Sequence, residues 1–164
     1  MSKGTLKTIV GDATNPQLTD DNEVAVIPHV CNDAGGWGAG FVVALSKRWR
    51  HPEEGYRRME KKLGSISTVN IGDGPVVINM IAQRGYIDSE MNPRPLKYNA
   101  LVECMEKVGK TYAAINSVGE EKYVIHCPKF GSDLAGGRWE FILDLIEDIW
   151  LNKGLDVVVY EFRG

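Results

Sequence analysis

The segment HVCNDAGGWGAGFVVALSKRW, from His29 to Trp49, constrains the fold of this chain more than any other. Four glycines fall within six residues, with a tryptophan among them, between an apolar strand pattern and a helical pattern. Packing alone gives no reason for such a cluster, because glycine loses more backbone entropy on folding than any other residue. The segment therefore predicts a backbone that either turns very tightly or comes very close to another molecule.

A second segment of the same kind lies in the C-terminal half. The apolar run KYVIHCP (122–128) leads into PKFGSDLAGGRW (128–139) and then into a helical pattern. Unpaired N–H groups at a helix N-terminus and in a glycine turn attract anions. Two such loops at one edge of a sheet predict a diphosphate site built from backbone N–H groups and not from cationic side chains. The alternative for the first loop, with Gly35, Gly36, Gly38 and Gly40, is a plain, tight strand-to-helix turn.

Strand and helix patterns alternate along the chain, without an internal repeat. Asp73–Gly74 predicts a hairpin, so the sheet is expected to be mixed. Pro28 is expected near the end of its strand or at a bulge. The alternation predicts an α/β fold with helices on both faces and ligands beyond the carboxyl ends of the strands. Strand patterns occupy 5–12, 23–30, 65–72, 75–83, 122–128 and 155–162, and helical patterns occupy 38–49, 51–64, 96–116 and 138–154.

Length and composition narrow the class of protein further. A chain of 164 residues suits one domain, spanning 1–164. The net charge is −3 and the Lys and Arg residues are scattered, unlike the basic face of a nucleic-acid-binding protein. No apolar run is long enough to cross a membrane, and the polar N-terminus does not resemble a signal peptide. The three cysteines fit free thiols in a reducing compartment, so a cytoplasmic location is expected.

Several known motifs do not fit this chain. The order GGxGxG at 35–40 departs from the GxGxxG of dinucleotide-binding folds. Gly109–Thr111 matches only the end of a phosphate-binding Walker A loop, and it lies within a predicted helix. His126 and Cys127 point to opposite faces of a strand, so no zinc site is expected. Cys31 is interpreted as a small buried hydrophobic residue and not as a nucleophile.

Three segments together resemble the ligand loops of macro domains, the ADP-ribose-binding modules. They are GDAT (11–14), HVCNDAGGWGAGF (29–41) and PKFGSDLAGGRW (128–139). The resemblance runs from the first strand to the last and is nearest the branch of ADP-ribose 1-phosphate phosphatases and small de-ADP-ribosylating proteins. It implies a three-layer α/β/α sandwich on a central mixed sheet, in agreement with the strand and helix patterns.

The resemblance also implies how adenine would be bound. Asp12 would accept a hydrogen bond from the exocyclic amine, and the Ala13 N–H would support the ring. Tyr160 or Phe162, at the end of the last strand, could stack on the base. The alternative for Asp12 is a turn residue before Thr14. The alternative for the two aromatic residues is ordinary alternation along a strand.

The same resemblance assigns the rest of the ligand to the two glycine segments. Asn32 would bond hydroxyls of the distal ribose. Gly36–Phe41 would wrap that ribose and one phosphate, and Gly131–Gly137 would cover the diphosphate from the other side. The implied ligand-binding residues are Asp12, Ala13, Asn32, Gly36, Trp37, Gly38, Ala39, Gly40, Phe41, Gly131, Ser132, Asp133, Leu134, Ala135, Gly136, Gly137, Tyr160 and Phe162.

Three residues are candidates for a catalytic role. His29 could act as a general acid or base, and the alternative is a strand histidine with a satisfied hydrogen bond. Asp133 could position a water molecule, and the alternative is a cap of the following helix. The candidate catalytic residues are His29, Asn32 and Asp133.

These residues lead to an expected function. The chain is expected to bind ADP-ribose and to hydrolyse ADP-ribose 1-phosphate to ADP-ribose and phosphate, without a metal or another cofactor. One alternative is removal of ADP-ribose from modified macromolecules, and another is a non-catalytic reader. Ala82 or Gln83, and Ala135, stand where the de-ADP-ribosylating relatives carry a lysine and an aspartate, so that machinery is not expected. The expected partner is ADP-ribose or a derivative; a membrane is not expected, and nucleic acid only as an ADP-ribosylated substrate.

Overall fold

The computed structural model describes residues 2–72, 74–86 and 90–163. The strands are β1 (Leu6–Val10), β2 (Glu23–Asn32), β3 (Ile66–Asn70), β4 (Val76–Gln83), β5 (Lys122–Pro128) and β6 (Val157–Glu161). The α-helices are α1 (Phe41–Arg48), α2 (His51–Arg58), α3 (Tyr98–Val118) and α4 (Trp139–Leu145). A π turn (Ile146–Trp150) and a 3-10 turn (Leu151–Lys153) extend α4.

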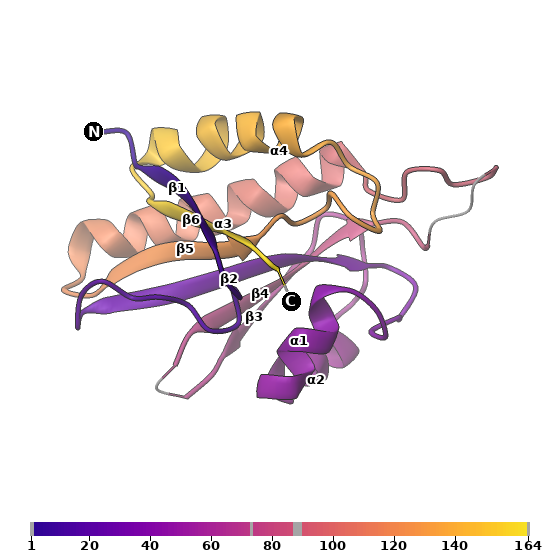
Figure 1. Ribbon diagram of the computed structural model, residues 1–164, viewed down its shortest axis with the longest axis horizontal. Coiled ribbons are helices and arrows are strands. Elements are labelled where there is room, and N and C mark those ends of the chain that lie inside the picture. The colour runs from indigo at the N-terminus through magenta and orange to yellow at the C-terminus, as the bar shows by residue number, and fades with distance from the viewer. Residues whose placement is uncertain (1, 73, 87–89, 164) are drawn as a thin grey trace.

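The strands form one sheet between two layers of helices. Their order is β1-β6-β5-β2-β4-β3, and all neighbours are parallel except β3 and β4. Helices α3 and α4 cover one face of the sheet, and α1 and α2 cover part of the other (Figure 1). Alternate residues of β4 therefore enter different cores: Ile78 and Met80 join the α3 side, and Val77 and Ile81 join the α1–α2 side. The predicted α/β sandwich with a mixed sheet is confirmed.

The antiparallel pair arises from the predicted hairpin. β3 and β4 pair from Ile66 with Met80 to Asn70 with Val76. Asp73 of the predicted turn lies outside the described residues. The short connection forces these two strands to be antiparallel, whereas the other connections are long enough for parallel pairing.

The sheet opens between β2 and β5. β2 pairs with β5 only from Glu23 to Val26, whereas its pairing with β4 continues to Asn32. From β2 the chain runs through α1 and α2 towards one edge of the sheet, and from β5 it runs through α4 towards the other. Such a switch point leaves a crevice beyond the carboxyl ends of the strands, where α/β proteins bind ligands.

Pro28 lies in the middle of β2, opposite Ile78, so its predicted place at a strand end or bulge is wrong. The register shift falls instead between Cys31 and Asn32. At the level of Pro28 the strand no longer pairs with β5. A strand with a partner on one side only tolerates a residue that lacks an N–H group.

Glycine positions explain where several helices begin and end. α1 begins at Phe41, later than the predicted start at Gly38, because Gly40 has a φ of +82°, which a helix does not allow. α2 ends at Arg58, earlier than predicted, where the next residue is extended. Gly154, with a φ of +82°, ends the last helical segment as predicted. None of the described helices is long and apolar enough to cross a membrane.

Candidate functional site

A cavity of about 930 Å³ lies at the carboxyl ends of β2, β5 and β6, where the sheet opens. Its walls include the first glycine loop (33–40), after β2, and the second glycine loop (129–137), after β5. The two loops predicted from sequence therefore face the same space. The predicted site residues that line it are Asp12, Ala13, His29, Asn32, Gly36, Gly38, Ala39, Gly40, Phe41, Gly131, Ser132, Asp133, Leu134, Ala135, Tyr160 and Phe162.

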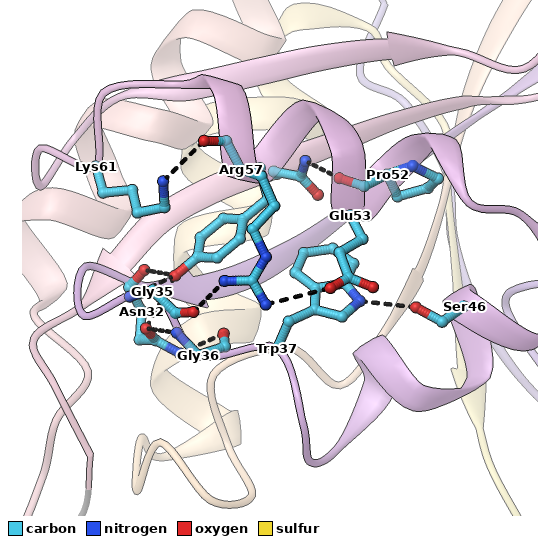
Figure 2. Close-up of polar contacts among 11 residues, drawn as sticks. Asn32, Gly35, Gly36, Trp37, Ser46, Pro52, Glu53, Arg57 and Lys61 are labelled. Atoms are coloured by element: carbon cyan, nitrogen blue, oxygen red, sulfur yellow. Dashed lines mark hydrogen bonds and ion pairs between the residues drawn. The ribbon is translucent and has the colours of Figure 1, made fainter.

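Three predicted site residues do not line the cavity and instead support the loops. The Trp37 indole is 8% exposed, packs against Tyr56, and donates to Ser46 Oγ at 2.7 Å (Figure 2). Gly136 and Gly137 close the second glycine loop through N–H bonds to the carbonyls of Asp133 (3.0 Å) and Gly131 (2.8 Å). These three residues therefore shape the loops that line the cavity.

Asn32 organises the first glycine loop from within. Its Oδ1 accepts hydrogen bonds from the N–H groups of Ala34 (2.9 Å) and Gly36 (3.1 Å), and its Nδ2 donates to the Gly36 carbonyl at 2.9 Å (Figure 2). The Tyr56 hydroxyl lies 2.9 Å from the same Oδ1. An amide nitrogen carries two hydrogens, so the second N–H of Asn32 has no partner among the described residues.

Two residues of α2 that the sequence analysis missed also hold this loop. The Tyr56 hydroxyl accepts from the Gly35 N–H at 3.0 Å and lies 2.7 Å from the Asn32 carbonyl oxygen. The Arg57 guanidinium donates to the Gly35 carbonyl and pairs with Glu53 at 3.2 Å (Figure 2). The helical pattern of α2 carried no signal for this role, because the contacts depend on how α2 packs under the loop.

His29 is buried beneath the first glycine loop, with 1% of its surface exposed. Its Nε2 lies 2.6 Å from Asn79 Oδ1, and Asn79 Nδ2 donates to the Pro52 carbonyl at 3.0 Å. That second bond fixes the Asn79 amide, so His29 carries its proton on Nε2 and donates it. Burial lowers the pKa of His29 to about 4. The imidazole is therefore neutral at pH 7 and a weak base, which fits the interpretation of a strand histidine with a satisfied hydrogen bond.

Asp12 lies at the opposite side of the cavity, at the end of β1. Its Oδ1 accepts from the Thr14 N–H at 2.9 Å and from the Thr14 hydroxyl at 2.8 Å. This is the turn that the sequence offered as an alternative role. The other carboxylate oxygen has no partner among the described residues, so Asp12 can serve the turn and accept from a ligand at once.

Tyr160 of β6 and Phe162, the residue after the strand, differ in their exposure, and both line the cavity. Tyr160 is 2% exposed, whereas Phe162 is 70% exposed. Phe162 is therefore the ring with a free face for stacking, whereas the Tyr160 ring is buried.

Asp133 lies exposed at the rim of the cavity in the second glycine loop. It does not cap α4, because the N-cap is Arg138, whose N–H donates to the Tyr98 hydroxyl at 2.9 Å. That alternative role is therefore wrong. The Asp133 carboxylate has no hydrogen bond or ion pair among the described residues and lines the cavity.

Cationic side chains contribute little to this cavity. Among the described lining residues Lys129 is the one cation, and its Nζ lies 3.8 Å from Glu161. Asp12, Asp133 and Glu161 add negative charge. An anion in this cavity would therefore rely on the N–H groups of the glycine loops and of the α1 N-terminus.

The sequence analysis missed other lining residues. Gln83 ends β4 at the same sheet edge, so its place could have been inferred from the strand pattern. Tyr86 follows in an irregular connection and carried no local signal. Its hydroxyl lies over Gly36, where an added Cβ atom would come within 2.0 Å of it. Among the described residues, no three His, Cys, Asp or Glu side chains gather where they could hold a metal ion.

Comparison with known proteins identifies the family. No family model matches the chain. A protein of unknown function from Bacteroides thetaiotaomicron is 38% identical and superposes with a TM-score of 0.83. The match covers 96% of this chain and 98% of that protein's chain. A macrodomain protein from Streptomyces coelicolor is 34% identical over 97% of this chain and 99% of its own, with a TM-score of 0.77. The chain belongs to the macrodomain family.

More distant relatives extend the comparison. Chromodomain-helicase-DNA-binding protein 1-like of Danio rerio is 25% identical over 171 residues, which are 96% of this chain but only 16% of that protein. The chain thus spans about a sixth of the curated relative. A Thermosipho africanus DarTG structure, solved in complex with ADP-ribose, is 12% identical, covers 97% of this chain and 42% of its own, and has a TM-score of 0.70. At that identity the likeness shows the fold alone.

Proposed function

We propose that the cavity binds ADP-ribose. The observation that carries this proposal is that both glycine loops and Asp12 line one cavity. The volume of about 930 Å³ suits a dinucleotide-sized ligand. The macrodomain fold, and the distant DarTG relative that was solved with ADP-ribose, add support.

The ligand would lie across the open end of the sheet. Its adenine would donate from the exocyclic amine to the free oxygen of Asp12 and stack on Phe162. Its diphosphate would lie between the two glycine loops, on N–H groups that no side chain covers. Its distal ribose would reach the remaining N–H of Asn32.

Calorimetry with ADP-ribose tests this proposal. We expect Asp12→Ala to weaken binding by about tenfold, because a hydrogen bond to a charged group is lost. Asp21→Ala is the matched control, since Asp21 is exposed in the same connection and does not line the cavity. Equal affinity in the Asp12→Ala variant would refute the adenine assignment, and no binding by the wild type would refute the proposal.

A second function, hydrolysis of ADP-ribose 1-phosphate, is favoured by the free carboxylate of Asp133 at the rim of the cavity. Asp133 would position a water molecule that attacks phosphorus. The bond between phosphorus and the ribose oxygen would break, and the proton given up by the water would pass to that oxygen, releasing ADP-ribose and phosphate. Neutral His29 would take no proton at pH 7 and would act by holding the first glycine loop from below.

Phosphate release separates this second function from binding alone. We expect Asp133→Asn to bind ADP-ribose normally and to lose most of its turnover, and His29→Gln to keep turnover if that variant folds. Tight binding without phosphate release by the wild type would identify a reader. Release of ADP-ribose from a modified glutamate peptide would favour the de-ADP-ribosylating alternative.

A further inference from the structure

We propose that a buried chain of Glu23, His126 and Tyr160 is a positioning network that sets selectivity for adenine over other purines. It does so through the adenine-side loop, which we define as residues 11–19. The proposal rests on the proposed binding of ADP-ribose and assigns a role to three residues that need not touch the base edge.

The three side chains of this network come from three neighbouring strands and meet inside the molecule. His126 of β5 has no exposed surface, and Glu23 of β2 is 8% exposed. The Nε2 atom of His126 lies 2.6 Å from Glu23 Oε2, and its Nδ1 atom lies 2.8 Å from the Tyr160 hydroxyl of β6. A buried polar chain of this kind holds its members in one arrangement, because any unpaired member would be costly.

The donors and acceptors fix the direction of each hydrogen bond in this network. The Tyr160 hydroxyl accepts from the Gln17 N–H at 2.8 Å, which leaves its own hydrogen for His126 Nδ1. His126 then carries its proton on Nε2 and donates it to Glu23. Burial opposes ionisation of Glu23, but hydrogen bonds from Thr19 and His126 outweigh it and lower the pKa of the carboxyl. Burial also lowers the pKa of His126, so a neutral imidazole faces a carboxylate at pH 7.

Both ends of this network, Tyr160 and Glu23, hold the adenine-side loop. At one end Tyr160 bonds Gln17, and its ring touches Gly11, where an added Cβ atom would lie 3.3 Å from it. Ala13, 2% exposed, belongs to the same apolar cluster as Tyr160. At the other end the Thr19 N–H and hydroxyl donate to Glu23 Oε1 at 3.0 and 2.8 Å.

Selectivity for adenine follows because Asp12 and Ala13 lie in the adenine-side loop, which is held at both ends. The Asp12 carboxylate can accept from the amine of adenine, but it repels the carbonyl oxygen that hypoxanthine carries at that position. Such discrimination requires the carboxylate to stay within a fraction of an ångström of its place. Loss of the Tyr160 or Glu23 bond would let the loop move. The affinity for the adenine ligand would then fall more than the affinity for the hypoxanthine ligand.

The test compares the affinity for ADP-ribose with that for its hypoxanthine analogue, measured by calorimetry. We expect Tyr160→Phe to lower the affinity for ADP-ribose by about three- to tenfold and the affinity for the analogue much less. The ratio of the two affinities, which measures selectivity, should therefore fall. Tyr112→Phe is the control: it removes a hydroxyl from a buried tyrosine of α3 that does not line the cavity, and the ratio should not change.

Glu23→Gln provides a second variant with a spectroscopic readout. A glutamine amide that faces Nε2 with its N–H group would move the His126 proton to Nδ1, and Tyr160 could no longer donate there. Nitrogen chemical shifts of His126 report this change of tautomer. We expect the shift together with a reduced selectivity ratio.

The outcomes are distinct. An unchanged ratio in both variants, with ADP-ribose still bound, would overturn the positioning network and leave the proposed function intact. No binding of ADP-ribose by the wild type would refute the proposed function itself. A lower unfolding temperature with an unchanged ratio would identify a purely structural role and would also overturn the inference.

Discussion

The two glycine loops face one cavity but are held in different ways. The first is built around polar side chains: Asn32 bonds it from within, and Tyr56 and Arg57 bond it from below. The second is held by its own backbone and by apolar packing, with Gly131 and Gly137 pressed against Leu96. One loop depends on a few strong directional contacts, and the other on close packing.

This difference indicates where each loop is vulnerable. A buried polar network fails when one member is removed, because its partners are left unsatisfied. A packed loop tolerates loss of a side chain but not the addition of atoms at its tightest points. Substitutions of opposite kinds should therefore break the two loops.

The largest effect is expected from Asn32→Ala, which removes the centre of the first glycine loop. We expect the free energy of unfolding to fall by about 3 kcal/mol, since the side-chain bonds to the loop are lost and the N–H groups of Ala34 and Gly36 are left without this acceptor. Affinity for ADP-ribose should fall with it. Denaturant unfolding and calorimetry check both quantities.

Asn116→Ala is the matched control for that variant. Its amide also bonds backbone groups, those of Tyr123 at 2.8 and 2.9 Å, but it lies on α3 and does not line the cavity. It should lower stability without lowering affinity. If both variants lose affinity equally, the first loop is not specifically organised by Asn32.

His29, buried beneath the first glycine loop, should make the free energy of unfolding depend on pH. The pKa of His29 is about 4 in the folded chain and 6.5 in the unfolded one. As the pH falls below 6.5 the unfolded chain binds a proton that the folded chain does not, so stability present above pH 6.5 is lost towards pH 4. The loss amounts to about 3 kcal/mol.

Unfolding measured at several pH values, for the wild type and His29→Gln, checks this. The variant should show a shallower fall between pH 6.5 and 4. His126 contributes in the same direction, because its pKa is also lowered, so some slope should remain. Identical slopes in the two proteins would contradict the assignment of a neutral, buried His29.

Gly137→Ala should break the second loop by adding one carbon atom. The new Cβ would lie 2.4 Å from Leu96 Cδ2 and 2.5 Å from the Gly131 carbonyl oxygen. Since the backbone oxygen cannot move freely, we expect a loss of about 2 kcal/mol in the free energy of unfolding. Gly36→Ala is the comparison, because its Cβ meets only the end of the half-exposed Tyr86 side chain, which can swing away. A larger loss in Gly36→Ala would reverse the comparison.

The smallest effect is expected from Arg57→Ala. Its ion pair with Glu53 involves side chains that are 49% and 40% exposed, so solvent screens it. We expect a loss of about 0.5 kcal/mol, reduced further by added salt. Thermal unfolding at two salt concentrations measures it. A loss as large as that of Asn32→Ala would mean that the bond from Arg57 to the Gly35 carbonyl holds the loop as strongly as Asn32 does.

Much of the fold could be predicted from local patterns. Short apolar runs located the six strands of the described residues, and Asp73–Gly74 indicated the antiparallel pair of β3 and β4. The glycine at 154 ended its helix as predicted, because few other residues adopt a positive φ there. Pro28 was misplaced, because the prediction could not include where β5 stops pairing with β2.

Local sequence also pointed to the cavity, because each glycine loop directly follows a buried strand and the ends of parallel strands meet at one edge. The roles of individual side chains could not be inferred in this way. His29 owes its neutral state to burial and its tautomer to Asn79, and Tyr160 owes its fixed hydroxyl to His126, on strands far apart in the chain. Glycine content and hydrophobic period are properties of neighbouring residues, whereas hydrogen-bond partners and desolvation depend on which strands lie side by side, and only the folded sheet decides that.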